Sequence, residues 1–288
     1  MKEFKIGSLK FRNPVITASG TFGMGDVFSD FIDYSKIGGI TLKTVTRNPR
    51  KGNPPPRILE TPSGLLNSIG LENEGFEKVY SGLNQDDYLK CCDTNIIFSI
   101  AGESKEDYID MAEAFSQIKS IAMLELNLSC PNIHAGGATF DSDPDVVIYI
   151  IKNLRKKITK PFAVKLSPAN DLVKNSMIAS DYGADAVTIS NTFLGMAIDI
   201  QKKDFVFKNK VAGYSGPAVK PIALYNVFKA AQAVKIPMIS SGGIASINDA
   251  REFLIAGAQF ISIGTMNFLE PDISMKIAED LENWDYLQ

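Results

Sequence analysis

Short apolar runs recur along the chain, and each is followed by small or polar residues and then by a stretch with helical spacing. A short apolar run bounded by turn residues is typical of a buried strand. The candidate strands are residues 15–17, 39–42, 96–98, 121–126, 162–164, 186–189, 237–239 and 260–263. This repeat is the main signal for the fold.

Between these runs, apolar residues return at the spacing of an amphipathic helix. The predicted helices cover residues 107–118, 144–158, 172–182, 222–234 and 248–256. Gly183 and Gly257 follow two of them, as expected for helix ends. Strand and helix alternating eight times predict an α/β fold, a (β/α)8 TIM barrel in a single domain over residues 1–288. A doubly wound open sheet is the alternative.

Other stretches lie outside the repeat. Residues 4–11 alternate apolar and polar positions around Gly7-Ser8, which predicts an N-terminal β-hairpin. Residues 47–75 and 197–220 are long and carry several Pro and Gly residues. Long irregular segments in a compact domain are usually functional or disordered, and the loops after barrel strands build the active site. We therefore expect long active-site loops here.

The apolar run 121–126 ends in a polar cluster, formed by Asn127, Ser129, Cys130 and Asn132. The chain has one histidine, His134, so a base other than histidine must be considered. A thiolate can act as a base where its surroundings lower its pKa, which makes Cys130 a candidate. The alternatives are a small buried thiol at the end of a core strand for Cys130, and a surface loop position for His134.

In a barrel, the carboxyl ends of all strands meet at one face. The residues expected to converge there include Lys43, Ser99, Asn127, Lys165, Asn191, Gly242, Gly243 and Gly264. Gly242-Gly243 and Gly264-Thr265 follow the last two predicted strands, where barrels commonly bind phosphate through backbone N–H groups. The pattern predicts a phosphate-anchored, anionic ligand beside a cysteine and several amides, without naming the ligand.

Composition and charge bear on which classes of protein the chain can belong to. The chain has 288 residues, 45% hydrophobic and 22% charged, with a formal net charge of -3. A pI of about 5.4 gives no sign of nucleic-acid binding. No apolar run is long enough for a transmembrane helix, and the N-terminus lacks a signal-peptide core, so no membrane association is expected. Three cysteines form no disulfide framework, which suits a cytoplasmic protein.

The segment Asn127-Leu128-Ser129-Cys130-Pro131-Asn132 resembles the signature of the class 1 dihydroorotate dehydrogenases, FMN enzymes of pyrimidine synthesis. Similar motifs follow in order at residues 17–23, 43–46, 52–57, 67–73, 165–168, 191–192 and 215–218, and at the two glycine motifs. The Pro54-Pro55-Pro56-Arg57 segment and the 132–137 loop are most similar to the 1B subclass. The membrane-bound class 2 enzymes carry serine at the position of Cys130.

The resemblance implies oxidation of (S)-dihydroorotate to orotate, with Cys130 as general base at C5 and the flavin as acceptor of the hydride from C6. It assigns the substrate to Lys43, Asn67, Ser68, Ile69, Gly70, Leu71, Asn127, Asn191 and Thr192. It assigns FMN to Ser19, Lys43, Thr44, Ser99, Asn127, Lys165, Ser190, Gly216, Gly242, Gly243, Gly264 and Thr265, and it assigns no metal. Lys165 is expected near the flavin N1–C2 edge, and the 132–141 loop over the substrate.

The resemblance also implies a partner. The 1B subclass pairs the FMN subunit with a subunit that carries FAD and an iron–sulfur cluster and passes electrons to NAD⁺. A homodimer of the FMN subunit within a heterotetramer is therefore expected. The residues agree, because Ala18 to Gly23 after the first strand is no dinucleotide fingerprint, and three cysteines are too few for a four-thiolate cluster.

Some positions depart from the family pattern and border the expected flavin loops; they are Ser99, Ala169-Asn170-Asp171, Ser190 and Ala212-Gly213-Tyr214. Three alternatives to the proposed activity remain. They are a related FMN barrel that reduces uracil-type pyrimidines, a tRNA dihydrouridine synthase, and a non-catalytic barrel that binds a phosphate ligand. The tRNA enzyme needs a basic surface, which this composition does not indicate.

Overall fold

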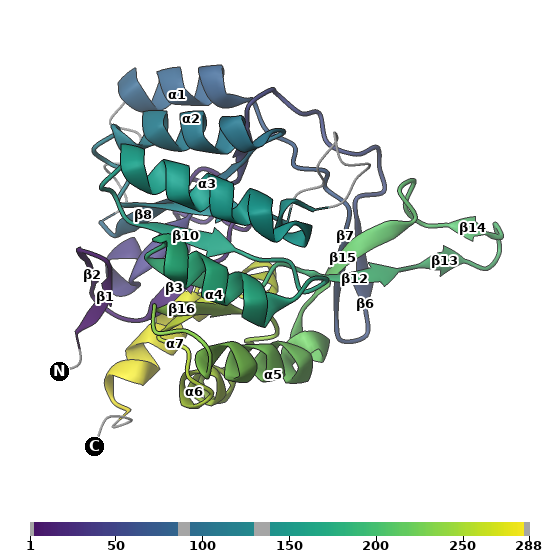
Figure 1. Cartoon of the computed structure of the whole chain (residues 1–288). Helices are drawn as coiled ribbons and strands as arrows, with labels where there is room; N and C mark the ends of the chain where they lie inside the picture. Colours follow the sequence, from purple (N-terminus) through teal and green to yellow (C-terminus); the bar gives the residue numbers. More distant parts are fainter. Residues whose placement is uncertain (1–2, 86–92, 130–138, 285–288) are drawn as a thin grey trace.

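The computed structural model describes residues 3–85, 93–129 and 139–284. At its centre is a closed barrel of eight parallel strands, drawn with its surrounding helices in Figure 1. The strands are β3 (Val15–Thr17), β4 (Gly39–Thr41), β8 (Asn95–Ala101), β9 (Met123–Asn127), β10 (Phe162–Lys165), β11 (Ala186–Ile189), β16 (Met238–Ser241) and β17 (Phe260–Ile263). Pairing of β4 with β8 closes the ring, and the predicted (β/α)8 barrel is confirmed. A short strand, β5 (Val45–Thr46), extends the edge of β8.

Helices surround the barrel, as the alternating pattern predicted. They are α1 (Phe76–Gln85), α2 (Lys105–Ser116), α3 (Pro144–Lys157), α4 (Leu172–Tyr182), α5 (Lys220–Ala231), α6 (Ile247–Ile255) and α7 (Ile273–Glu282). Short 3-10 turns lie at Tyr34–Lys36, Phe140–Ser142, Pro217–Val219 and Thr265–Phe268. Helices α1 and α7 were not predicted, although apolar residues recur at Ile273, Ile277 and Leu281 on the buried face of α7.

The barrel interior is apolar at the amino end of the strands. Its side chains, which include Ile97, Met123, Ala163 and Phe260, form one buried cluster. The predicted hairpin, β1 (Phe4–Ile6) paired with β2 (Leu9–Phe11), packs against this end. The rings of Phe11 and Phe260 lie 4.8 Å apart, centroid to centroid, in an edge-to-face contact. The hairpin therefore closes the amino end of the barrel (Figure 1).

Two positions further along the same strands, the interior becomes polar. Side chains alternate along a strand, so residues two apart share a face. Ser99, Glu125, Lys165 and Thr188 follow Ile97, Met123, Ala163 and Ala186 at this spacing, and all four are buried. We call the apolar cluster at the amino end the apolar plug. A polar layer therefore separates the apolar plug from the carboxyl ends of the strands.

The two long stretches and residues 193–196 form an antiparallel sheet beside the carboxyl end of the barrel. The sequence pattern did not predict this sheet. Its strand order is β12 (Phe193–Met196), β15 (Val211–Ser215), β7 (Gly64–Asn67) and β6 (Ile58–Thr61). A small hairpin, β13 (Ile198–Asp199) with β14 (Asp204–Phe205), projects beyond it (Figure 1). We call the four-stranded sheet the flap. It brings residues far apart in sequence together, because Asn67 pairs with Gly213.

Candidate active site

Two asparagines lie together where β9 and β11 end. Asn191 donates from Nδ2 to Ser129 Oγ at 2.5 Å and to Asn127 Oδ1 at 3.3 Å. Ser129 Oγ donates to the same Asn127 oxygen at 2.7 Å. The hydroxyl of Tyr108 donates to the backbone oxygen of Asn127 at 2.7 Å, which fixes the end of the strand. The structure thus joins two of the predicted substrate-binding amides through Ser129.

The flap adds further predicted substrate residues. Asn67 Nδ2 donates to the Gly213 oxygen at 3.3 Å, and the amide N–H of Thr192 donates to Asn191 Oδ1 at 2.8 Å. A Cβ atom built on Gly213 would lie 2.2 Å from Thr192 Oγ1, so this position requires glycine. Within the Ala212-Gly213-Tyr214 segment, Gly213 keeps the glycine of the family pattern, and the close approach of β15 to Thr192 gives this a steric cause.

The chain after β7 is held in a tight path by Asn53. Its Nδ2 donates to the oxygen of Ser68 at 3.1 Å and to Ser68 Oγ at 3.0 Å, and its N–H donates to the Ile69 oxygen at 2.9 Å. Gly70 and Leu71 follow with φ values of 75° and 54°. A Cβ atom at Gly70 would lie 2.8 Å from the backbone nitrogen of Asn53, so only glycine fits. The predicted Ser68 to Leu71 backbone is thus rigidly shaped.

A buried ion pair lies in the polar layer of the barrel. Lys165 Nζ is 3.8 Å from Glu125 Oε1, and the two side chains are 7% and 5% exposed. Lys165 Nζ also donates to Ser19 Oγ at 3.2 Å. Thr188 Oγ1 donates to the other carboxylate oxygen, Glu125 Oε2, at 3.0 Å. The structure brings Lys165 and Ser19 together, as expected for residues of one cofactor site.

The remaining predicted side chains lie at neighbouring strand ends. Thr44 Oγ1 and Ser99 Oγ share a buried hydrogen bond of 2.8 Å. Ser190 Oγ donates to the Asn191 oxygen at 3.0 Å. Lys43 is half-buried and lines a cavity of about 390 Å³ with Glu72 and Asn73 among others. Within the described part of the chain, Lys43 forms no hydrogen bond with the asparagine cluster.

The glycine motifs gather near the amino end of α5. A Cβ at Gly243 would lie 2.6 Å from the backbone nitrogen of Lys220, the first residue of α5, and a Cβ at Gly242 would lie 2.9 Å from Ala223. Thr265 Oγ1 donates to Ser215 Oγ at 2.8 Å, next to Gly216. Backbone N–H groups at a helix start attract anions, so this glycine cradle suits a phosphate.

Cys130 lies outside the described residues, as do Asn132 and His134. The chain on either side is fixed. Leu128 donates from its N–H to the Lys165 oxygen at 3.1 Å, and the N–H of Asp141 donates to the Leu128 oxygen at 3.3 Å. The segment that contains Cys130 therefore leaves and rejoins the described structure at adjoining points on the barrel rim.

Asp141 fixes the start of the described chain that follows Cys130, through hydrogen bonds of its side chain. Its carboxylate accepts from the Ser167 N–H at 2.5 Å and from Asn170 Nδ2 at 2.7 Å, and the side chain is almost completely buried. Burial raises the pKa of Asp141, although these hydrogen bonds oppose the shift. Asn170, one of the departures from the family pattern, thus anchors the end of the predicted 132–141 loop.

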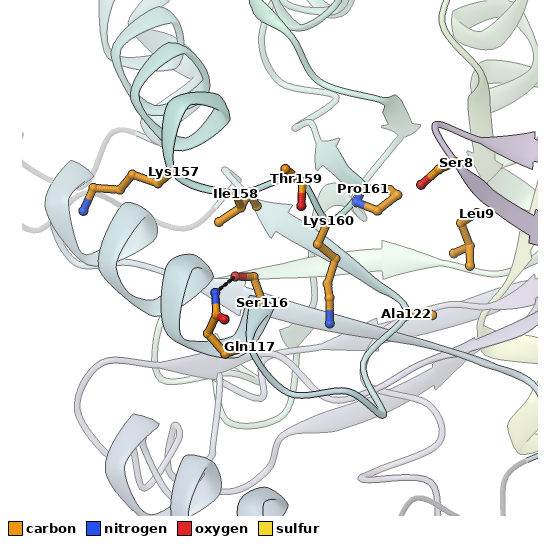
Figure 2. A pocket seen from close by; sticks show the side chains of 10 residues that line it. All are labelled: Ser8, Leu9, Ser116, Gln117, Ala122, Lys157, Ile158, Thr159, Lys160 and Pro161. Carbon is orange, nitrogen blue, oxygen red and sulfur yellow. Dashed lines mark hydrogen bonds between the residues drawn. The ribbon is translucent and has the colours of Figure 1, made fainter.

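Another cavity, of about 430 Å³, lies at the amino end of the barrel near the hairpin (Figure 2). Four of its polar side chains, those of Ser116, Gln117, Lys157 and Lys160, already have partners. Ser116 accepts from Gln117, Lys157 pairs with Glu113 at 2.5 Å, and Lys160 donates to the Ile118 oxygen at 2.7 Å. Barrel active sites lie at the opposite end of the strands, and none of the predicted site residues lines this cavity.

Sequence reasoning missed Glu125, Thr188, Tyr108 and Asp141. The signal for Glu125 was present, because a carboxylate inside an apolar strand needs a buried partner. Thr188 lies within an apolar run, where a β-branched threonine looks like any other strand residue. Tyr108 and Asp141 act across the fold on Asn127, Ser167 and Asn170, and nothing local in the sequence indicates those contacts.

Comparisons with known proteins show which family the chain resembles. The family model described as dihydroorotate dehydrogenase matches residues 1–284. A protein from Thermoanaerobacter pseudethanolicus is 44% identical over 283 residues, which is 98% of this chain and 93% of the relative. Proteins from Geotalea uraniireducens and Bacteroides thetaiotaomicron are 43% and 44% identical, over 97% of this chain and 92% of each relative. All three are named dihydroorotate dehydrogenase B (NAD(+)), catalytic subunit.

The anchor at Asp141 predicts a specific pH dependence of stability. The pKa of Asp141 in the folded state is raised above its ordinary value of 3.8. The shift therefore stabilises the folded protein fully below pH 3.8, and this stabilisation is lost as the pH rises through the raised pKa. Asp141→Asn removes this titration and one hydrogen-bond acceptor, at a cost of roughly 1–3 kcal/mol. Thermal unfolding between acid and neutral pH should show a flatter profile for the variant. Parallel profiles for the two proteins would contradict the assignment.

Proposed function

The chain belongs to the dihydroorotate dehydrogenase family, and from that premise we propose that it oxidises (S)-dihydroorotate to orotate in pyrimidine synthesis. The chain covers almost the whole length of its NAD⁺-linked relatives, so the same class 1B activity is proposed for it. The observation that carries this proposal is the cluster of Asn127, Ser129 and Asn191 at the barrel mouth, beside the buried Lys165.

The described residues fit FMN. The glycine cradle leaves no room for side chains at Gly242 and Gly243 and offers backbone N–H groups at the start of α5 to the phosphate. Gly216, Gly264 and Thr265 complete this end of the site, and Ser215 is bonded to Thr265. Ser19, Thr44, Ser99 and Ser190 provide hydroxyl groups, with Lys43 and Lys165 as cations. When bound, FMN supplies the acceptor for the hydride that leaves the substrate.

The amide cluster fits the substrate. Dihydroorotate presents ring N–H and carbonyl groups in one plane together with a carboxylate, and asparagine supplies both donors and acceptors. Asn67, Asn127, Asn191 and Thr192 hold the ring, and the rigid Ile69 to Leu71 backbone, with Lys43, faces the carboxylate. Pre-formed bonds within this set reduce the ordering that binding requires, because the side chains already have fixed orientations.

Cys130 is the proposed general base. It takes the proton from C5 of the substrate, and the amides keep the ring in place while C6 loses its hydride. The Leu128 and Asp141 hydrogen bond holds the two ends of the Cys130 segment on the rim next to β10. The 132–141 loop excludes water from the reacting atoms in this proposal, with Asp141 as its fixed end.

Electron transfer to NAD⁺ requires a partner in this proposal. The chain carries no glycine fingerprint for a dinucleotide after its first strand, and Cys130 is assigned to catalysis. A second subunit with FAD and an iron–sulfur cluster therefore takes the electrons from FMN, within a heterotetramer built on a homodimer of this chain. No helix among residues 3–85, 93–129 and 139–284 is long and apolar enough to cross a membrane.

Replacement of Cys130 tests the catalytic assignment. Cys130→Ala should retain yellow, bound FMN but lose reduction of the flavin by dihydroorotate by about 10²–10⁴-fold, because a positioned base contributes that much. Cys130→Ser should keep slight activity, shifted to higher pH, since a hydroxyl is a weaker acid than a thiol. Stopped-flow absorbance of the flavin measures both. A loss of less than about tenfold in the alanine variant would remove Cys130 from the mechanism.

The partner requirement gives a separate prediction. The isolated chain should oxidise dihydroorotate with an artificial acceptor dye but should not form NADH, because it has no route from FMN to a dinucleotide. Addition of the FAD and iron–sulfur subunit should restore NADH formation, followed at the NADH absorbance band. Efficient NADH formation by the isolated chain would overturn the 1B assignment, and efficient turnover with fumarate would favour the 1A subclass.

A further inference from the structure

Glu125 has no assigned role, yet it lies in the interior of the barrel against Lys165, one of the residues proposed to hold the flavin. It shares the inward face of β9 with Met123 and Asn127, between the apolar plug and the amide cluster. Its Oε2 accepts from Thr188, whereas its Oε1 is buried and has no hydrogen-bond partner among the described residues. An unsatisfied buried carboxylate oxygen is costly and needs an explanation.

Lys165 is the cation that faces this oxygen. The Nζ to Oε1 distance of 3.8 Å is within the range of an ion pair but too long for a direct hydrogen bond. An ammonium group has three donors, and Ser19 Oγ is its one hydrogen-bond acceptor in the described part of the chain. Glu125 therefore neutralises the charge of Lys165 without saturating its donors.

We propose that Glu125 is a positioning residue that acts on FMN through Lys165. The inference rests on the proposed function and deepens it. With oxidised FMN, Glu125 is the counter-ion that keeps the Lys165 ammonium in the barrel interior. Reduction adds negative charge to the flavin ring, and the ammonium then faces two negative groups instead of one. Thr188 holds Oε2 and so directs Oε1 toward Lys165.

In this proposal, the opposite charges of Lys165 and Glu125 together set the reduction potential of bound FMN. An unopposed ammonium in a buried site would strongly stabilise the reduced, anionic ring. Glu125 offsets part of that field, so the reduction potential of FMN stays lower than Lys165 alone would make it. NAD⁺ is a weak oxidant, and a flavin that must pass electrons toward it benefits from a lower potential.

The test is the midpoint potential of bound FMN in Glu125→Gln, which keeps the shape of the side chain and removes its charge. The reduced-to-oxidised ratio at a fixed potential should rise at least tenfold, equivalent to about +30 mV for a two-electron couple. Lys165→Met should shift the ratio in the opposite direction. Reference-dye titration during slow anaerobic reduction measures the potential of each protein.

The double variant shows whether Glu125 acts through Lys165. If Glu125 acts on the flavin through the charge of Lys165, removal of the carboxylate has little effect once that charge is absent. Glu125→Gln in the Lys165→Met background should therefore change the ratio by less than threefold. Asp185→Asn is the matched control, because it removes a partly buried carboxylate that pairs with Arg155 at the opposite end of the barrel, and it should leave the ratio unchanged.

Urea unfolding of the same purified proteins gives a readout independent of the flavin. If the two charges are partners, the double variant should be more stable than the sum of the single losses indicates. If wild type binds FMN but Glu125→Gln shifts the ratio less than threefold, or toward oxidised flavin, the role of Glu125 is wrong and the proposed function stands. If wild type binds no FMN, the proposed function fails, and the flavin role of Glu125 fails with it.

Discussion

Side chains alternate along the parallel strands, and this alternation determines which residues of the barrel point into its interior. Every second residue must enter a closed interior, where a polar side chain needs a partner within the protein or it costs stability. The amino half meets this constraint with an apolar layer closed by the hairpin. In the next layer, Glu125 forms an ion pair with Lys165 and accepts a hydrogen bond from Thr188. The polar residues at the mouth therefore lie above a layer of paired charges.

The flap brings further polar side chains toward the proposed substrate site. Barrel strand ends supply Asn127 and Asn191. Pairing of β7 with β15 places Asn67 against Gly213 and next to Thr192. Two segments that are separated in sequence by β8, β9, β10 and β11 therefore form one wall of the proposed site.

The repeat of apolar runs was sufficient to predict the barrel, because each buried strand has a local signature and the alternation with helices leaves few topologies. The convergence of Asn127 with Asn191 followed from the same rule that parallel strand ends share a face, whereas only the family resemblance assigned Ser19 to one site with Lys165. The flap did not follow, because its antiparallel pairs join strands of non-local segments and no local pattern states their register. Asp141 illustrates the same limit, since only the fold places it against Ser167 and Asn170.

In the proposed mechanism, proton and electron removal from the substrate belong to different parts of the fold. The described residues on either side of the proposed base, Cys130, are joined by the hydrogen bond from Asp141 to Leu128. Lys165, the cation proposed to lie next to the flavin, belongs to the barrel interior, where it contacts Glu125 and Ser19. Since β10 provides both Lys165 and the carbonyl that accepts from Leu128, a single strand links the two parts. A displacement of β10 would therefore disturb proton transfer and flavin charge together, which is a physical reason for it to lie wholly buried between β9 and β11.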